Sequence, residues 1–129
     1  MRVLLDTHAF LWWVSARGGR LSDRARELLS DGATDASFSI ASAWEIAIMV
    51  GGGRMVLPDA PERYVPDRLR HHGFELMPIE LSHAIRAGAL PPLHRDPFDR
   101  MLIAQAQIEG LPILTADPAI SRYDVETIW

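Results

Sequence analysis

Short apolar runs alternate along the chain with longer segments in which apolar residues return every three or four positions. The short runs are rich in strand-forming residues and lie between turn signals, which is typical of buried parallel strands. They lie at residues 2–6, 36–40, 74–79, 112–115 and 125–129. Because strands and helices alternate, the pattern predicts an α/β fold with a mostly parallel sheet.

The segments with a helical period carry capping and termination signals that place their ends. They run from Thr7 through Val14 to a break at Gly18-Gly19, from Ser22 to before Gly32, over 41–50, over 62–72, over 80–89, and from Asp96 to Gly110. Thr7 is expected to cap the first helix. Pro66 is expected to interrupt the helix at 62–72, because proline lacks a backbone N–H. Asp117-Pro118 is expected to start a helical turn.

Length and composition restrict the chemistry that the chain offers. With 129 residues, positions 1–129 are expected to form a single domain. The chain has no cysteine, and all thirteen basic residues are arginine. These absences exclude disulfides, Cys-ligated zinc, thiol nucleophiles, lysine Schiff bases and P-loop binding through lysine. The net charge of -4 argues against broad nonspecific nucleic-acid binding, unless a cation neutralises clustered acids.

The apolar stretches do not predict a membrane protein. Asp6 and His8 interrupt the N-terminal stretch before it reaches the length of a signal peptide. The longest apolar region, 37–50, is too short to cross a bilayer and contains Glu45. We therefore expect a cytoplasmic protein without membrane contact.

Four acidic residues follow predicted strands or begin predicted helices. They are Asp6, Glu45, Asp99 and Asp117. In an open α/β sheet functional groups gather at the carboxyl ends of the strands, so these acids are candidates for one shared site. Carboxylates at close range repel one another, which a bound divalent cation would relieve. Oxygen ligands alone favour Mg²⁺ or Mn²⁺ over zinc.

Separate capping roles are the alternative, because helix starts recruit acids in any case. Asp96-Pro97 and Asp117-Pro118 have the form of an N-cap followed by proline. Ser42 and Glu45 form a capping-box pattern, and Asp99 suits the positive end of the helix dipole. Asp6 is the least easily explained in this way, since it ends an apolar strand. Spacing alone leaves both interpretations open.

Segments around these acids match a known family. LLDTHAFLWW, SAWEIAI, HRDPFDRMLIAQA and LTAD, in this order, resemble PIN-domain proteins, above all the bacterial toxin ribonucleases of VapBC-type toxin–antitoxin pairs. The resemblance extends from Val3 to about Asp117, and HRDPFDRMLIAQA is its most specific segment. It implies a three-layer α/β/α fold with a central sheet of about five strands.

The resemblance also implies roles for individual residues. Asp6 and Asp99 correspond to the family's main Mg²⁺ ligands, while Glu45 and Asp117 correspond to acids that complete the catalytic pocket. Thr7 and Thr115 match hydroxyl positions beside the acids, and are supporting residues. Asp96 lies one helical turn before Asp99 and is expected to be a cap first and a site residue second.

Basic and aromatic residues near these segments are candidates for binding. Arg95 and Arg100 are placed either to hold RNA phosphates or to form salt bridges, and Arg54 stands near the position where relatives often carry lysine. His94 is a candidate acid or base, with a surface or capping role as the alternative. Of the adjacent Trp12 and Trp13, one is expected in the core and the other in a groove for a partner.

The resemblance implies a Mg²⁺- or Mn²⁺-dependent endoribonuclease that cleaves RNA phosphodiesters with a metal-activated water. It further implies the toxin role in a type II pair, a small cognate antitoxin that blocks the pocket, and a homodimer. The alternative is a non-cleaving PIN-like module that works through protein contacts. A small-molecule phosphatase is less well supported, because the DTH segment lacks the second aspartate of a DxD loop.

Overall fold

A computed structural model of the chain describes residues 1–15 and 20–129. In this part of the chain all paired strands run parallel and form one sheet in the order β3-β2-β1-β4-β5. The strands are β1 (Arg2–Leu5), β2 (Asp35–Ser39), β3 (Glu75–Met77), β4 (Ile113–Leu114) and β5 (Thr127–Ile128). The predicted α/β class and the five parallel strands are confirmed.

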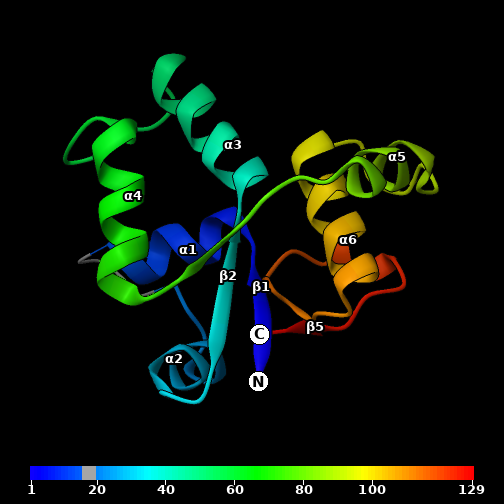
Figure 1. The fold of residues 1–129 in the computed structure, drawn as a ribbon, viewed down its shortest axis with the longest axis horizontal. Coiled ribbons are helices and arrows are strands. Elements are labelled where there is room, and N and C mark those ends of the chain that lie inside the picture. Colours follow the sequence, from blue (N-terminus) through cyan, green and yellow to red (C-terminus); the bar gives the residue numbers. More distant parts are fainter. Residues whose placement is uncertain (16–19) are drawn as a thin grey trace.

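Helices cover both faces of this sheet (Figure 1). They are α1 (Thr7–Val14), α2 (Asp23–Ser30), α3 (Ile40–Gly51), α4 (Pro61–His72), α5 (Leu81–Ala89) and α6 (Pro97–Glu109), followed by a short 3-10 turn at Ile120–Arg122. Residues of the first four helices share one hydrophobic cluster with the sheet, and residues of α5 and α6 share the other. The predicted three-layer arrangement is therefore present.

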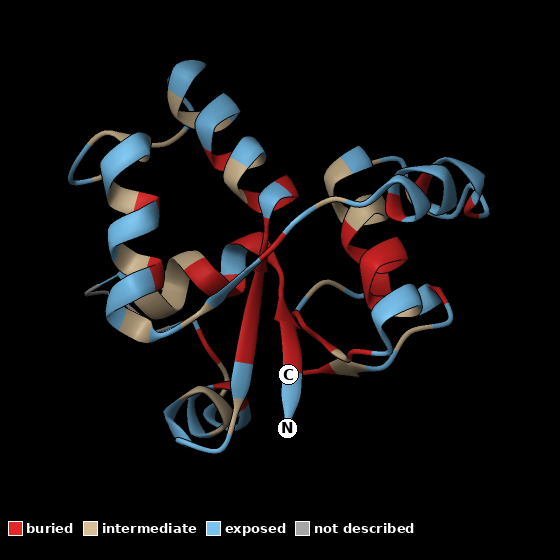
Figure 2. Cartoon of the chain, viewed as in Figure 1, coloured by how far each residue is buried: buried red, intermediate tan, exposed pale blue. Residues whose placement is uncertain are grey.

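Strand β1 shows how the sequence builds two cores. Successive side chains of a strand point to opposite faces, so Val3 and Leu5 belong to one cluster and Leu4 to the other. All three are fully buried, as expected for a central parallel strand. Figure 2 shows buried residues concentrated on β1, β2 and the middle of α6.

Helix α6 is tied to the sheet by a buried amide as well as by apolar packing. The Ser39 hydroxyl donates to Gln105 Oε1 at 2.6 Å, and Gln105 Nε2 donates to the carbonyl of Pro78 at 3.2 Å. Gln105 is fully buried, so its polar atoms depend on these partners. The amide thereby fixes α6 against the end of β2 and the segment after β3.

Two local predictions are wrong. The N-cap of α1 is Asp6, and Thr7 is the first helical residue. Pro66 does not interrupt α4, which runs unbroken over Pro61–His72. Pro66 and Glu62, four positions earlier, are both exposed, so water can satisfy the carbonyl that loses its N–H partner. The predicted break at Gly18-Gly19 lies outside the described residues.

Among the described residues, none of the helices combines the length and the apolar character that a membrane span requires.

The buried amide gives a first testable prediction. Gln105→Ala leaves the Ser39 hydroxyl and the Pro78 carbonyl without this partner, and should lower the free energy of unfolding by about 1–3 kcal/mol. Urea denaturation measures the change. The control is Gln107→Ala, two positions along the same helix and half-exposed, which should change the free energy by about 0.5 kcal/mol or less. Equal losses in the two variants would contradict a special role for the buried amide.

Candidate active site

The structure brings four acids that are distant in sequence to one pocket of about 350 Å³. We call it the acidic pocket; its lining includes Asp6, Glu45, Asp99, Asp117, Thr7, His8, Trp12, His94 and Asp96. The reason lies in the topology. Strands β2, β1 and β4 are neighbours and parallel, so the segments that follow them leave the sheet at the same edge. Helix α6 leads into β4 and therefore begins at that edge as well.

Asp6 is held by hydrogen bonds to both of its carboxylate oxygens. Oδ1 accepts from the backbone N–H of Ala9 at 2.6 Å, which makes Asp6 the N-cap of α1, and Oδ2 accepts from the Thr115 hydroxyl at 2.5 Å. The sequence favours Asp6 least among the acids as a cap, and the structure shows that it is one. Burial raises the pKa of Asp6, while the bond from Thr115 opposes that rise.

Glu45 is positioned by the hydroxyl of Thr7. Thr7 donates to Glu45 Oε1 at 2.6 Å and also contacts Ser42 Oγ at 2.9 Å. The capping-box interpretation of Ser42 and Glu45 is wrong, because α3 begins earlier and is capped by Ser39. Burial raises the pKa of Glu45, and the Thr7 bond opposes it. Its carboxylate therefore faces the pocket rather than a helix end.

Asp99 and Asp117 meet around an imidazole. His94 Nε2 lies 2.7 Å from Asp99 Oδ2 and 3.9 Å from Asp117 Oδ2. Burial, supported by the charge of Asp96, raises the pKa of Asp99 to about 6, although the hydrogen bond from His94 opposes this rise. Asp117 also accepts from the backbone N–H of Ala119 at 2.9 Å, so it closes its own turn as well as lining the pocket.

Thr115 links two of the acids through one hydroxyl. Its Oγ1 donates to Asp6 Oδ2 and accepts from the backbone N–H of Asp117 at 3.0 Å. The side chain is buried, and a hydrogen bond in such an environment is stronger than one in water. The two threonines noted in the sequence therefore each orient a carboxylate: Thr7 orients Glu45, and Thr115 orients Asp6.

Asp96 is the N-cap of α6, as the sequence predicts. Its Oδ1 accepts from the backbone N–H groups of Phe98 at 2.8 Å and Asp99 at 3.3 Å. Asp96 also lines the acidic pocket. The cap fixes the first turn of α6 and with it the position of Asp99.

The Arg100 side chain forms hydrogen bonds within the protein. Its guanidinium donates to four backbone carbonyls and the Tyr123 hydroxyl at 2.9–3.3 Å; the carbonyls belong to Ala87, Leu90, Pro91 and His94. Neither predicted role, holding RNA phosphates or pairing with an acid, matches this arrangement. Arg54 and Arg95 are exposed.

His94 is a pocket residue whose role the sequence leaves open between an acid or base and a surface or capping residue. Its side chain is 20% exposed and contacts Asp99, so it is not a free surface residue. The available signal was its place just before Asp96-Pro97, where a loop enters the helix that carries Asp99. Spacing alone did not show that the imidazole turns toward the acids.

The donor set of the acidic pocket fits a divalent cation. Among the described residues, one group of three potential metal ligands has ligand atoms within 4.8 Å of one another, namely His94, Asp99 and Asp117. The group does not include Asp6 or Glu45, whose carboxylates line the same pocket. Neighbouring acids add to the rise in pKa of the buried ones, so a cation would relieve an existing repulsion.

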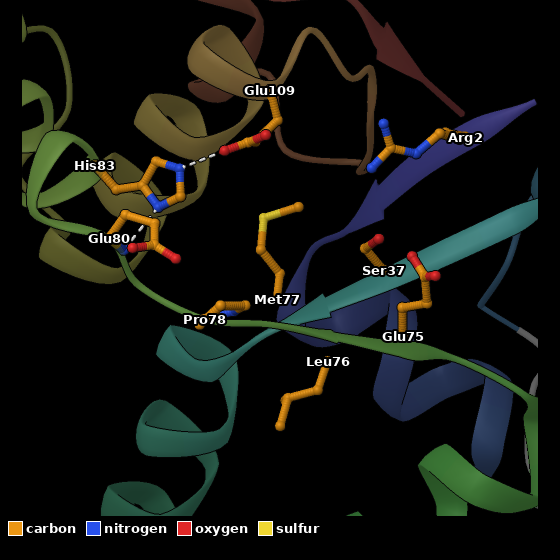
Figure 3. Close-up of a pocket in the computed structure, with 9 residues that line it drawn as sticks. All are labelled: Arg2, Ser37, Glu75, Leu76, Met77, Pro78, Glu80, His83 and Glu109. Carbon is orange, nitrogen blue, oxygen red and sulfur yellow. Dashed lines mark hydrogen bonds and ion pairs between the residues drawn. The ribbon is translucent and has the colours of Figure 1, made fainter.

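A second polar pocket lies elsewhere and differs in character (Figure 3). There His83 is buried, its Nδ1 accepts from the backbone N–H of Glu80, and its Nε2 contacts Glu109, both at 2.9 Å. Both ring nitrogens are thus used to join α5 to the end of α6. This pocket contains none of the four acids predicted from the sequence.

The fold is that of a family of known proteins. The chain belongs to the PIN domain family, whose model matches residues 3–126. It is 37% identical over 67 residues to Ribonuclease VapC16 of Mycobacterium tuberculosis, a match that covers 52% of this chain. The matched region spans about half the length of that curated relative, 48%.

Solved structures share the fold over the whole chain. One is VapBC2 from Rickettsia felis bound to a promoter DNA fragment, with a TM-score of 0.72, 14% identity, and coverage of 100% of this chain and 99% of that one. Another is a toxin–antitoxin complex from Klebsiella pneumoniae, with a TM-score of 0.68, 17% identity, and coverage of 98% and 96%. At these identities the likeness establishes the fold.

The raised pKa of Asp99 predicts a stabilising substitution. The folded protein holds this proton more tightly than the unfolded chain does, so stability falls as the pH rises from about 4 to about 6. Asp99→Asn removes the charge, and without divalent ions at pH 7.5 it should raise the free energy of unfolding by about 1–2 kcal/mol. Urea denaturation with a chelator measures this.

The gain should shrink toward zero as the pH falls through about 4, because Asp99 is then protonated in the folded protein and becomes protonated in the unfolded chain as well. Asp124→Asn, on an exposed residue outside the pocket, serves as the control and should change little at either pH. A destabilised Asp99→Asn variant at pH 7.5 would contradict the repulsion inferred for the acidic pocket.

Proposed function

We propose that this chain is a divalent-metal-dependent endoribonuclease and the toxin of a type II toxin–antitoxin pair. The observation that carries the proposal is the meeting of four acids from separate elements in one pocket. Membership of the PIN domain family supports it, as do a curated relative named as a ribonuclease and fold neighbours solved as VapBC or toxin–antitoxin complexes. A reaction on RNA phosphodiesters suits a site of clustered carboxylates that takes Mg²⁺ or Mn²⁺.

In this proposal Asp6 and Asp99 hold a Mg²⁺ or Mn²⁺ ion, and Glu45 and Asp117 complete its surroundings. When bound, the ion supplies an activated water and neutralises the charge that develops on the phosphate. Thr7 fixes Glu45 through its 2.6 Å bond, which leaves the second oxygen of this carboxylate available to orient the attacking water. In-line attack of water on phosphorus forms one P–O bond while the P–O bond to the departing sugar oxygen breaks. That oxygen takes up a proton from the surroundings, and no covalent intermediate with the protein is required.

Thr115 favours the ionised form of Asp6 and orients its carboxylate. A hydroxyl that donates to a carboxylate stabilises its charged form and so opposes the effect of burial. The N-cap bond from Ala9 acts in the same direction. Together they present Asp6 to the pocket in a single orientation.

RNA phosphates are proposed to contact Arg54 and Arg95, which are exposed and have the guanidinium geometry for bidentate phosphate binding. Arg100 is not included, because its guanidinium donates hydrogen bonds to backbone carbonyls. A cation in the acidic pocket would also lower the repulsion between the pocket and the RNA backbone.

A small antitoxin is proposed to dock beside the acidic pocket. A cleft of about 890 Å³ shares His8 and Trp12 with that pocket and continues along Leu11, Val56 and Tyr64. Trp12 and Trp13 are both half-buried, so neither is a fully buried core residue, as one of them was expected to be. The proposal includes a homodimer, as the resemblance implies.

Asp6→Asn tests the nuclease. The variant keeps the size of the side chain but loses the charge, and we expect it to lose RNA cleavage and growth arrest while staying folded. Cleavage of total RNA in the presence of Mn²⁺, growth after induction, and circular dichroism measure the three properties. Asp124→Asn should cleave like the wild type. Undiminished cleavage by folded Asp6→Asn would refute the assignment.

Metal binding should also raise the free energy of unfolding. At a free ion concentration about 100 times the dissociation constant, Mn²⁺ should stabilise the wild type by about 2.7 kcal/mol. Thermal or urea unfolding with and without a chelator measures the gain. Asp6→Asn should gain less, because it lacks one proposed ligand. Equal gains in both proteins would place the ion elsewhere.

A further inference from the structure

We propose that His94 is a direct ligand of the divalent ion, which makes the acidic pocket a mixed nitrogen–oxygen site that prefers Mn²⁺ to Mg²⁺. This inference rests on the proposed function and adds a ligand that the four-acid pattern does not contain. It concerns the wall of the pocket formed by the loop before α6 and the loop after β4.

The spacing of the three ligand atoms supports a shared ion. Ligands about 2.1 Å from one cation lie about 3–4 Å apart when they occupy neighbouring or opposite positions around it. His94 Nε2 lies 2.7 Å from Asp99 Oδ2 and 3.9 Å from Asp117 Oδ2, and all three ligand atoms lie within 4.8 Å of one another. Small side-chain adjustments would therefore place all three around one ion.

The backbone of His94 is fixed on both sides, so the imidazole is placed by the fold. Its N–H donates to the Tyr123 hydroxyl at 2.8 Å, and its carbonyl accepts from Arg100 at 3.2 Å. Tyr123 is buried and in turn donates to the Pro91 carbonyl at 2.7 Å. A loop built only to reach α6 would not need a buried tyrosine and an arginine to hold this residue.

A purely structural hydrogen bond between His94 and Asp99 is the competing explanation. Helix α6 does not need it, because Asp96 already caps the first turn. The same ring nitrogen also faces Asp117, which belongs to a different loop and has its own backbone partner. One imidazole nitrogen between two carboxylates fits a metal ligand better than a cap.

The nitrogen donor has a consequence for the choice of ion. Mg²⁺ favours oxygen ligands and retains its waters, whereas imidazole suits transition ions. Replacing one oxygen of the coordination sphere by Nε2 therefore shifts preference toward Mn²⁺. Losing a ligand or its support typically costs about 10–100-fold in metal affinity, so about a tenfold effect is expected here.

Pulsed electron paramagnetic resonance of the full chain loaded with Mn²⁺ tests the inference, because it detects nitrogen bonded directly to the ion. We expect ¹⁴N coupling in the wild type and none in His94→Gln, whose amide retains a hydrogen-bond donor for Asp99. The matched control is His8→Gln: His8 lines the same pocket but is exposed and lies outside the three-ligand group. Its coupling should match the wild type.

Calorimetric titration supplies the second measurement. His94→Gln should lose about tenfold in Mn²⁺ affinity, and should lose clearly less for Mg²⁺. If His94→Gln does not fold, wild-type protein with ¹⁵N-labelled histidine replaces it, and the coupling should change to the ¹⁵N pattern. With His8→Gln still coupled, the nitrogen is then assigned to the remaining pocket histidine.

The outcomes separate the two proposals. Mn²⁺ binding that saturates without nitrogen coupling would overturn the role of His94 and leave the metal-dependent nuclease intact. Coupling that persists in folded His94→Gln would overturn it too. A wild type that binds no Mn²⁺ at all would overturn both.

Discussion

The close approach of four carboxylates, which desolvation and mutual repulsion both oppose, is the constraint around which this molecule is organised. A parallel sheet directs the ends of its strands to one edge, and here that edge carries acids from three segments following strands and from the start of α6. Burial disfavours the charges of Asp6, Glu45 and Asp99, and hydroxyl, backbone and imidazole donors contact these three carboxylates. These donors orient the acids without neutralising them. The negative charge that these donors leave uncompensated is the property that suits a cation site.

The arrangement of strands and helices could be predicted because it depends on patterns along the chain. Apolar runs, capping residues and the closing Gly110 place most elements within a residue or two. The exceptions depend on tertiary structure. Pro66 stays within α4 because its lost hydrogen bond lies on an exposed side, and Asp6 caps α1 while also belonging to the pocket. Neither fact is visible in a pattern of apolar positions.

The candidate site could likewise be predicted only in part. Asp6, Glu45, Asp99 and Asp117 could be singled out from strand and helix ends together with a family resemblance. Thr7, Thr115 and Asp96 could be named as supporting residues in the same way, but the contacts of His94 and Arg100 could not be predicted from the pattern of residues. Arg100 is the clearest case: in sequence it is an arginine beside an acid, and in space it gathers the carbonyls of a loop. That loop carries His94 to Asp99.

The four acids enter the pocket from elements spread over nearly the whole chain, and this distribution has a consequence for the newly made protein. Asp6 and Glu45 leave the ribosome long before Asp99 and Asp117, which follow them in the sequence. Domains fold as units, so a nascent chain holds an incomplete constellation until its last segments emerge. Biosynthesis thus imposes a delay between the first appearance of this polypeptide and any chemistry at its carboxylates.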